Sequence, residues 1–102
     1  MKQVIWTNFA ISELKNIYLY YRMVASDKVA DKIRKSIFDS TKHLSKQPLI
    51  GAIEENLVDL KQEHRYIVES NYKIIYRVLH NNIYITDIFD CRQSPQKMKK
   101  RN

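Results

Sequence analysis

The sequence predicts a single α+β domain in which an antiparallel helical hairpin packs on one face of an antiparallel β-sheet. Three observations lead to this fold class. A short alternating stretch opens the chain, two segments with helical periodicity follow it, and three β-rich runs fill the second half. The chain has 102 residues, which is the size of one domain, and we expect residues 1–102 to form that domain.

The first predicted elements are a short strand and a helix. Residues 2–6 alternate so that Val4 and Trp6 lie on one side, as in a strand. Thr7 or Asn8 can then begin a helix, because its side-chain oxygen can accept a hydrogen bond from a free backbone N–H group. One apolar stripe at helical spacing follows, made of Ala10, Leu14, Ile17, Tyr18 and Tyr21.

A second helix is predicted after a short connection at residues 23–25. Ser26 with Asp27 forms a typical N-terminal cap. The apolar face of this helix consists of Ala30, Ile33, Ile37 and Leu44. Pro48 ends the helix, since proline disfavours helical conformation at the residue before it. The two helices are therefore expected to form an antiparallel hairpin.

The segment of residues 48–63 is the least regular part of the chain. Gly51 is the only glycine of the sequence, so we expect a backbone position with positive φ there. This segment also concentrates acidic residues, namely Glu54, Glu55, Asp59 and Glu63. Leu57, Val58 and Leu60 indicate a short strand or one turn of helix.

The second half of the chain predicts a three-stranded antiparallel meander. The runs are Tyr66 to Glu69, Tyr72 to Leu79 and Ile83 to Phe89, all rich in Ile, Val and Tyr. Asn71 and the cluster at residues 80–82 separate the runs, and asparagine tolerates the left-handed backbone of tight turns. Arg65 precedes the first strand and Arg92 follows the last. We expect the fold to bring these two guanidinium groups together.

The ends of the chain and the second face of the sheet complete the prediction. No acidic residue follows Asp90, and the last residues carry no apolar periodicity, so residues 96–102 are expected to form a flexible basic tail. A helical hairpin covers only one face of a sheet. The other face is therefore expected to be open and to carry the function.

The formal net charge of +7 favours a polyanionic partner, which would be a nucleic acid, an acidic protein or a membrane surface. The alternative is a soluble basic protein whose charges are only solvated. No apolar run approaches the roughly 20 residues of a transmembrane helix, so we expect no membrane partner. A single cysteine forms no internal disulfide, which fits a reducing cytoplasm.

The sequence predicts no metal and no cofactor. His43, His64, His80 and Cys91 lack the paired spacing of zinc ligands. One glycine cannot build a phosphate-binding loop. Cys91 lacks a recognised activating histidine, so a buried or merely accessory thiol is expected rather than a nucleophile.

The cationic residues Arg65, Lys73 and Arg92 are the candidates for chemistry. Together they could hold a phosphate or stabilise the charge that builds up during RNA cleavage. His64 could act as a general base at neutral pH, or it could be an exposed turn histidine. In the alternative, both arginines pair with neighbouring acids, which are Glu63 or Glu69 for the first and Asp90 or Asp87 for the second.

The order and spacing of several motifs resemble the RelE/ParE toxin superfamily from about Val4 to Met98. These motifs are Trp6 with Ala10 and Leu14, Pro48-x-x-Gly51, Arg65, the run from Tyr72 to Val78, and Arg92-Gln93-x-Pro95. The resemblance implies a bacterial toxin of a type II toxin–antitoxin module of the plasmid-stabilisation type. It implies a cognate antitoxin whose acidic or amphipathic segment wraps the toxin, which agrees with the positive charge.

Two branches of the superfamily imply different targets. RelE-like toxins cut mRNA on the ribosome, which would assign the chemistry to Arg65, Lys73, Arg92 and His64. The sequence departs from that branch, because Ile67 stands where a second strand lysine is expected and Met98 where a C-terminal aromatic residue is expected. No Tyr, His or Phe follows Gln93, which leaves Glu63 and His64 as the nearby proton-transfer groups.

ParE-like toxins instead poison DNA gyrase and need no such set of residues. The strand arginine and the Arg-x-x-Pro ending resemble this branch more closely. It implies target or antitoxin contacts at Arg65, Arg77, Arg92 and Lys97. Enzymatic activity therefore stays open at this point, and so does a relative of the same fold that only binds a partner.

Overall fold

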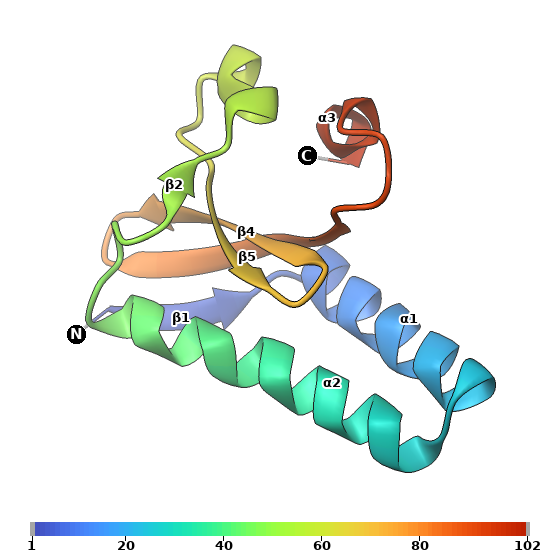
Figure 1. Ribbon diagram of the computed structural model, residues 1–102. Helices are drawn as coiled ribbons and strands as arrows, with labels where there is room; N and C mark the ends of the chain where they lie inside the picture. Colours follow the sequence, from blue (N-terminus) through green and yellow to red (C-terminus); the bar gives the residue numbers. More distant parts are fainter. Residues whose placement is uncertain (1, 102) are drawn as a thin grey trace.

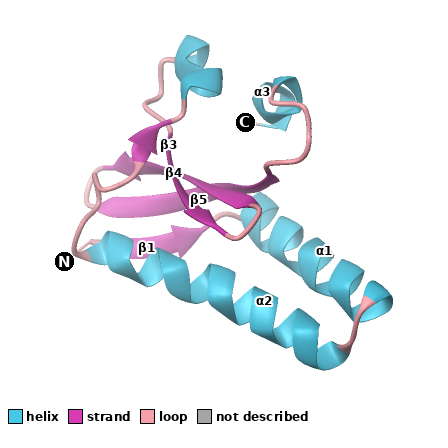
Figure 2. Ribbon diagram, viewed as in Figure 1, coloured by secondary structure: helices cyan, strands magenta, loops and turns pink. Residues whose placement is uncertain are grey.

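The computed structural model describes residues 2–101. It consists of a five-stranded sheet with two long helices on one face (Figures 1 and 2). The elements in chain order are β1 (Gln3–Trp6), α1 (Asn8–Val24), α2 (Asp27–Ser40), the 3-10 helix η1 (Thr41–Ser45), β2 (Ala52–Ile53), the 3-10 helix η2 (Glu55–Leu60), β3 (Arg65–Glu69), β4 (Tyr72–Leu79), β5 (Asn82–Asp90) and α3 (Gln96–Arg101). The predicted α+β class and the helical hairpin are confirmed.

The strands lie in the order β1-β5-β4-β3-β2. The meander β3-β4-β5 is antiparallel throughout, as predicted. β1 lies at one edge and pairs with β5 in parallel, and the helical hairpin forms part of the long connection between them. β2 contains two residues, pairs with the start of β3 at the other edge, and was not foreseen as a strand.

Both predicted helix caps are present. Thr7 Oγ1 accepts a hydrogen bond from the Ala10 amide at 3.2 Å, and Ser26 Oγ accepts one from the Val29 amide at 3.1 Å. Thr7 Oγ1 also donates to the carbonyl of Ile85 at 2.9 Å. The first cap therefore fixes the start of α1 against β5.

The main core lies between the helices and the sheet. Its buried residues from the helical part are Ala10, Ile17, Ile37 and Leu44, and those from the sheet are Tyr72, Ile74, Tyr76, Ile83, Ile85 and Ile88. Val4 and Trp6 of β1 pack against this cluster, so the predicted facing of the first strand is correct.

The second face of the sheet is not open, which corrects the prediction. Figure 1 shows η2 and α3 on the side of the sheet opposite α1 and α2. A second core cluster lies beneath them and consists of Leu57, Ile75, Phe89 and Met98. Met98 is 1% exposed, so the predicted flexible tail is a short helix docked on the sheet. Of the predicted tail, residue 102 lies outside the described residues.

Ion pairs hold α3 in this place. Lys99 Nζ lies 2.9 Å from a carboxylate oxygen of Asp59 in η2. Arg101 Nη2 lies 2.7 Å from oxygens of both Asp87 and Glu13, in β5 and α1. The basic residues of the segment therefore attach it to three other elements.

Gly51 serves close packing rather than a left-handed turn. Positive φ occurs instead at Lys61, Glu63, Ser70 and His80, and at no glycine. A Cβ atom at Gly51 would lie 2.6 Å from the Tyr76 hydroxyl oxygen and 2.7 Å from the Tyr66 carbonyl oxygen. The prediction of positive φ at Gly51 is therefore wrong.

Within residues 2–101, no helix combines the length and the apolar character that a membrane crossing requires.

Candidate functional site

Arg65 and Arg92 do not meet, contrary to the prediction. Arg65 is opposite Tyr76 of β4, whereas Asp90, close to Arg92, is opposite Tyr72. β3 and β5 both run antiparallel to β4, so the beginning of one and the end of the other lie at opposite ends of the sheet. Four residues of β4 separate the two positions, which is roughly 13 Å at ~3.3 Å per residue.

Arg65 begins β3, between Ile53 of β2 and Tyr76 of β4, and holds the loop before β2. Its Nη1 donates to the carbonyls of Leu49 at 3.3 Å and Gly51 at 2.8 Å. Its Nε lies 3.5 Å from the carboxylate of Glu63, which was one of its two expected acidic partners. The side chain is 19% exposed, so most of it is occupied with contacts inside the molecule.

Lys73 lies on the other face of the sheet from Arg65. Its Nζ lies 2.8 Å from a carboxylate oxygen of Glu54 and 4.3 Å from the centre of the Tyr66 ring. Glu54 is 1% exposed and also accepts two hydrogen bonds from Asn56. Burial acts to raise the pKa of Glu54, but the hydrogen bonds from Lys73 and Asn56 outweigh it and lower that pKa. Lys73 is therefore engaged in a buried ion pair that the sequence did not reveal.

His64 is buried and is not an exposed turn residue. It is 4% exposed, and its Nδ1 has no hydrogen-bond partner within the described part of the chain. Burial, followed by the positive charge of Arg77, lowers the pKa of His64, although the charge of Glu54 opposes this. A buried imidazole of this kind does not reach a substrate from its present position. The nuclease constellation of Arg65, Lys73, Arg92 and His64 is not assembled.

Arg77 and Lys97 belong to the second face and to α3. Arg77 Nε donates to the carbonyl of Gln62 at 2.9 Å, and the rest of the side chain is partly exposed. Lys97 is exposed on α3. Both side chains can therefore contact a partner on this side of the molecule.

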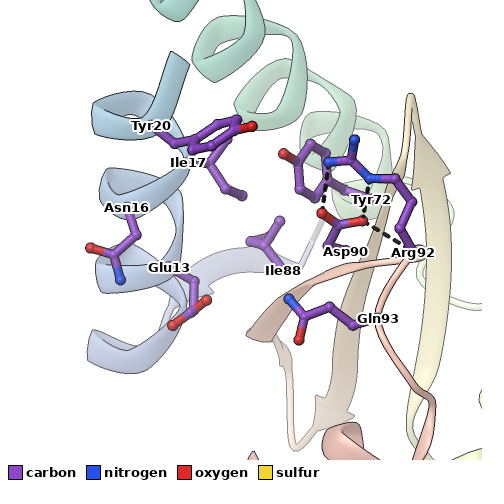
Figure 3. Close-up of a pocket in the computed structure, with 9 residues that line it drawn as sticks. All are labelled: Glu13, Asn16, Ile17, Tyr20, Tyr72, Ile88, Asp90, Arg92 and Gln93. Carbon is purple, nitrogen blue, oxygen red and sulfur yellow. Dashed lines mark hydrogen bonds and ion pairs between the residues drawn. The ribbon is translucent and has the colours of Figure 1, made fainter. Parts of the chain in front are cut away.

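Arg92 lies beside a hollow between α1 and the end of β5 (Figure 3). Its Nε and Nη2 donate to the two carboxylate oxygens of Asp90 at 2.9 and 2.8 Å. These hydrogen bonds lower the pKa of Asp90, although partial burial opposes the shift. The pair with Asp90 is one of the two expected alternatives, yet the Arg92 side chain remains 59% exposed. It is both positioned and accessible.

The hollow has a volume of about 350 Å³ and a mixed polar and apolar lining. Its residues are Glu13, Asn16, Ile17, Tyr20, Tyr72, Ile88, Asp90, Arg92 and Gln93. Burial and a 3.5 Å hydrogen bond to the Tyr21 hydroxyl raise the pKa of Tyr72, so its phenol stays neutral. The side chains in Figure 3 come from α1 on one side and from β4, β5 and the segment after it on the other.

Sequence reasoning missed the α1 side of this hollow. Glu13, Asn16, Ile17 and Tyr20 recur at intervals of three and four residues, which places them on one helix face. Their spacing was the available signal. Their position opposite Arg92 depends on the packing of α1 along β5, which periodicity does not determine.

A second groove runs along the exposed side of α1 and has a volume of about 550 Å³. Ile11, Leu14, Tyr18 and Leu19 supply its apolar lining, and Lys15, Arg22 and Arg34 supply its positive charges. Arg34 comes from α2 and lies 5.3 Å from the centre of the Tyr18 ring. The groove is therefore apolar with a cationic rim.

Among the described residues, no group of three His, Cys, Asp or Glu side chains is placed to hold a metal ion. The candidate site is consequently a set of cationic and apolar surfaces. Such surfaces can bind a macromolecule, but they do not by themselves supply proton transfer.

Comparison with known proteins identifies the family. Residues 4–95 match the model of the ParE toxin of the type II toxin–antitoxin system parDE. A chain of a solved structure, the chromosomal ParDE toxin–antitoxin system from P. aeruginosa, superposes with a TM-score of 0.75 and 23% identity, over 88% of this chain and 96% of that chain. At this identity the likeness shows the fold. None of the curated proteins compared with the sequence is similar enough to count as a match. Because the family model spans most of the chain, this protein belongs to the ParE toxins of type II toxin–antitoxin systems.

Proposed function

We propose that this toxin acts by binding DNA gyrase and that a cognate antitoxin neutralises it. One observation carries the choice of target: the residues that mRNA cleavage would need do not converge. Arg65 and Arg92 lie at opposite ends of the sheet, while His64 is buried. Lys73 is engaged in an ion pair with Glu54. A toxin that works by contact needs accessible side chains and no proton-transfer groups, and this molecule offers that arrangement.

The accessible cations are the proposed contacts with the target or the antitoxin. Arg92 is held in one orientation by Asp90, and its side chain is still 59% exposed and so accessible to a partner. Arg77 and Lys97 extend the positive surface on the second face. Arg65 is expected to act indirectly, through the loop that it holds.

The groove along α1 is the proposed antitoxin site. An amphipathic helix can place its apolar side against Ile11 and Leu19 and its acidic residues against Lys15, Arg22 and Arg34. Charge complementarity favours an acidic segment over a basic one. Both partners are cytoplasmic in bacteria, so we expect the toxin to act there.

Purified gyrase and a translation extract separate the two targets of the superfamily. The proposal expects inhibition of DNA supercoiling with accumulation of cleaved DNA, and Arg92→Ala is expected to reduce this inhibition several-fold. A His64→Phe variant serves as the nuclease control and is expected to keep the inhibition. Site-specific mRNA cuts on ribosomes, with gyrase unaffected, would overturn the proposal.

The antitoxin site is tested separately by co-purification with the partner protein. Leu19→Asp is expected to weaken the complex more than tenfold, because a carboxylate would replace apolar contact in the groove. Met23→Asp is the matched control, since Met23 is on the same helix, is 79% exposed and does not line the groove. Equal loss in both variants would argue against the groove.

A further inference from the structure

The loop of residues 47–51, called the apolar loop below, presents two large aliphatic side chains to solvent. Leu49 and Ile50 are each 59% exposed and take no part in either core cluster. They follow one another directly, and Ile53, three residues further along the chain, is 41% exposed. Aliphatic side chains gathered in this way on a surface mark an interaction site more often than scattered ones do.

The backbone of the apolar loop is held rigidly although its side chains are free. Arg65 Nη1 donates to the carbonyls of Leu49 and Gly51, at 3.3 and 2.8 Å. The Gly51 amide donates to the hydroxyl of Tyr76 at 2.9 Å, and Tyr76 is fully buried. The Ile50 amide donates to the carbonyl of Gln47 at 3.2 Å. The core therefore fixes the direction in which Leu49 and Ile50 point.

This rigidity has a consequence for binding. A partner that buries the two side chains does not have to order the loop, so little of the favourable interaction is lost to conformational entropy. The hydroxyl of a fully buried tyrosine and the guanidinium group of a largely buried arginine thus both hold the backbone of an exposed loop. It is the arrangement expected of a preorganised contact.

The chain segment that contains the apolar loop, residues 40–53, is basic. No acidic residue lies between Asp39 and Glu54 in the sequence, whereas Lys42 and Lys46 lie in that interval. Lys42 is paired with Asp39 at 3.0 Å, and Lys46 is exposed immediately before the loop. A partner is expected to offer an apolar pocket with carboxylates at its rim.

We propose that the apolar loop inserts into an apolar, acid-rimmed pocket on the folded protein that the toxin attacks. This inference rests on the proposed function, because that function supplies the target. Leu49 and Ile50 are exposed side chains on a short loop, which a concave surface can enclose, whereas an antitoxin helix needs a groove of the kind found along α1.

A second copy of the chain is the less favourable occupant. The groove along α1 is apolar, but its rim carries Lys15, Arg22 and Arg34, and these would face the basic flank of the loop. Such a head-to-tail contact would also leave a free loop and a free groove at each end and would continue into chains.

The test compares Leu49→Ser/Ile50→Ser with Val68→Ser, a control with the same 59% exposure in β3. Thermal unfolding and antitoxin affinity are measured first and are expected to change little in both variants. Inhibition of purified gyrase is expected to weaken more than tenfold in the loop variant and less than threefold in the control. Leu49→Met/Ile50→Val, which keeps the apolar surface, is expected to restore most of the inhibition.

Each outcome decides the matter. Full inhibition by the loop variant would overturn the inference while leaving gyrase as the target. If the wild-type protein does not inhibit gyrase, the proposed target is wrong, and growth arrest in cells is measured instead. Unchanged growth arrest by the loop variant would then contradict the inference. Loss of growth arrest in the loop variant would support the inference for another target. A loop-dependent self-association in light scattering would assign the loop to a second copy and contradict it. A wild-type chain that neither inhibits gyrase nor arrests growth would contradict both proposals.

Discussion

At the scale of single residues, the positively charged side chains matter through the partner each one has. Arg65 holds two carbonyls, Lys73 neutralises a buried Glu54, and Arg92 is oriented by Asp90. The sequence indicated that these residues are important and suggested the last pair, because its members are two positions apart. It did not reveal the pair of Lys73 with Glu54, since 19 positions separate them and only the folded chain brings them together.

The first prediction concerns Gly51. In Gly51→Ala the new Cβ would meet the Tyr76 hydroxyl and the Tyr66 carbonyl oxygen, and we expect a loss of about 2 kcal/mol in the free energy of unfolding. Urea denaturation measures it. Tyr76→Phe removes the hydroxyl oxygen but leaves the ring carbon Cε1 and the Tyr66 carbonyl oxygen, each 2.7 Å from the new Cβ. The double variant should therefore lose less than the sum of the single losses, but still more than Tyr76→Phe alone. An unchanged midpoint in Gly51→Ala would contradict this close packing around Gly51.

The second prediction concerns acid stability. The pKa of His64 is lowered below 6.5 in the folded protein, so the folded state binds fewer protons than the unfolded state near that pH. The corresponding stabilisation is complete above pH 6.5 and is lost as the pH falls from there. The pKa of Glu54 is lowered below 4.5, so its stabilisation is lost only at lower pH, through its folded-state pKa. The free energy of unfolding therefore rises with pH in both pH ranges.

Urea denaturation between pH 8 and pH 4 tests this order. His64→Phe is expected to flatten the first decline, while Glu54→Gln is expected to leave it in place. His43→Gln is the control, since His43 is exposed. A first decline that persists in His64→Phe would show that another group causes it.

At the scale of elements, local sequence signals were sufficient for the starts of the long helices and for the three meander strands. The predicted end of the second helix at Pro48 is wrong, because α2 ends at Ser40 and the 3-10 helix η1 follows it. Helical spacing and the caps at Thr7 and Ser26 are local properties, and each is present in the structure. α3 escaped prediction because its six residues contain a single large apolar side chain, Met98. The pocket that receives Met98 is formed by η2, β4 and β5, and no local pattern reports such a pocket.

The third prediction tests whether α3 is docked. Met98→Ala would leave a cavity beside Leu57, Ile75 and Phe89, and we expect a loss of about 2 kcal/mol in the free energy of unfolding. Lys100→Ala, in the same helix but exposed, is expected to change that free energy by less than about 0.5 kcal/mol. Amide hydrogen exchange of residues 96–101 should accelerate in the first variant only. Equal behaviour of the two variants would indicate a helix that does not depend on this contact.

At the scale of the whole molecule, the topology decides which charges can act together. A three-stranded meander places its entrance and its exit at opposite ends of the sheet, so Arg65 and Arg92 belong to different surfaces. The three meander strands and their antiparallel order were predicted correctly. The error was to infer from that order that the two arginines are close together. The sequence likewise did not predict that the second face of the sheet is covered. Two short helices that lie far apart in the sequence, η2 and α3, cover this face, as Figure 1 shows.

The last prediction follows from this separation. Arg65→Ala removes the anchor of the apolar loop, whereas Arg92→Ala removes a contact at the other end of the sheet. Distant sites contribute independently, so the fold-losses in gyrase inhibition are expected to multiply in the double variant. Combining Arg65→Ala with Leu49→Ser/Ile50→Ser is the matched comparison, and the losses should there be less than multiplicative, because both changes disable the same loop. The opposite result would be an Arg65→Ala/Arg92→Ala variant that inhibits gyrase as well as the less active of the two single variants does. It would show that the two arginines serve one site and would refute the arrangement of separate surfaces.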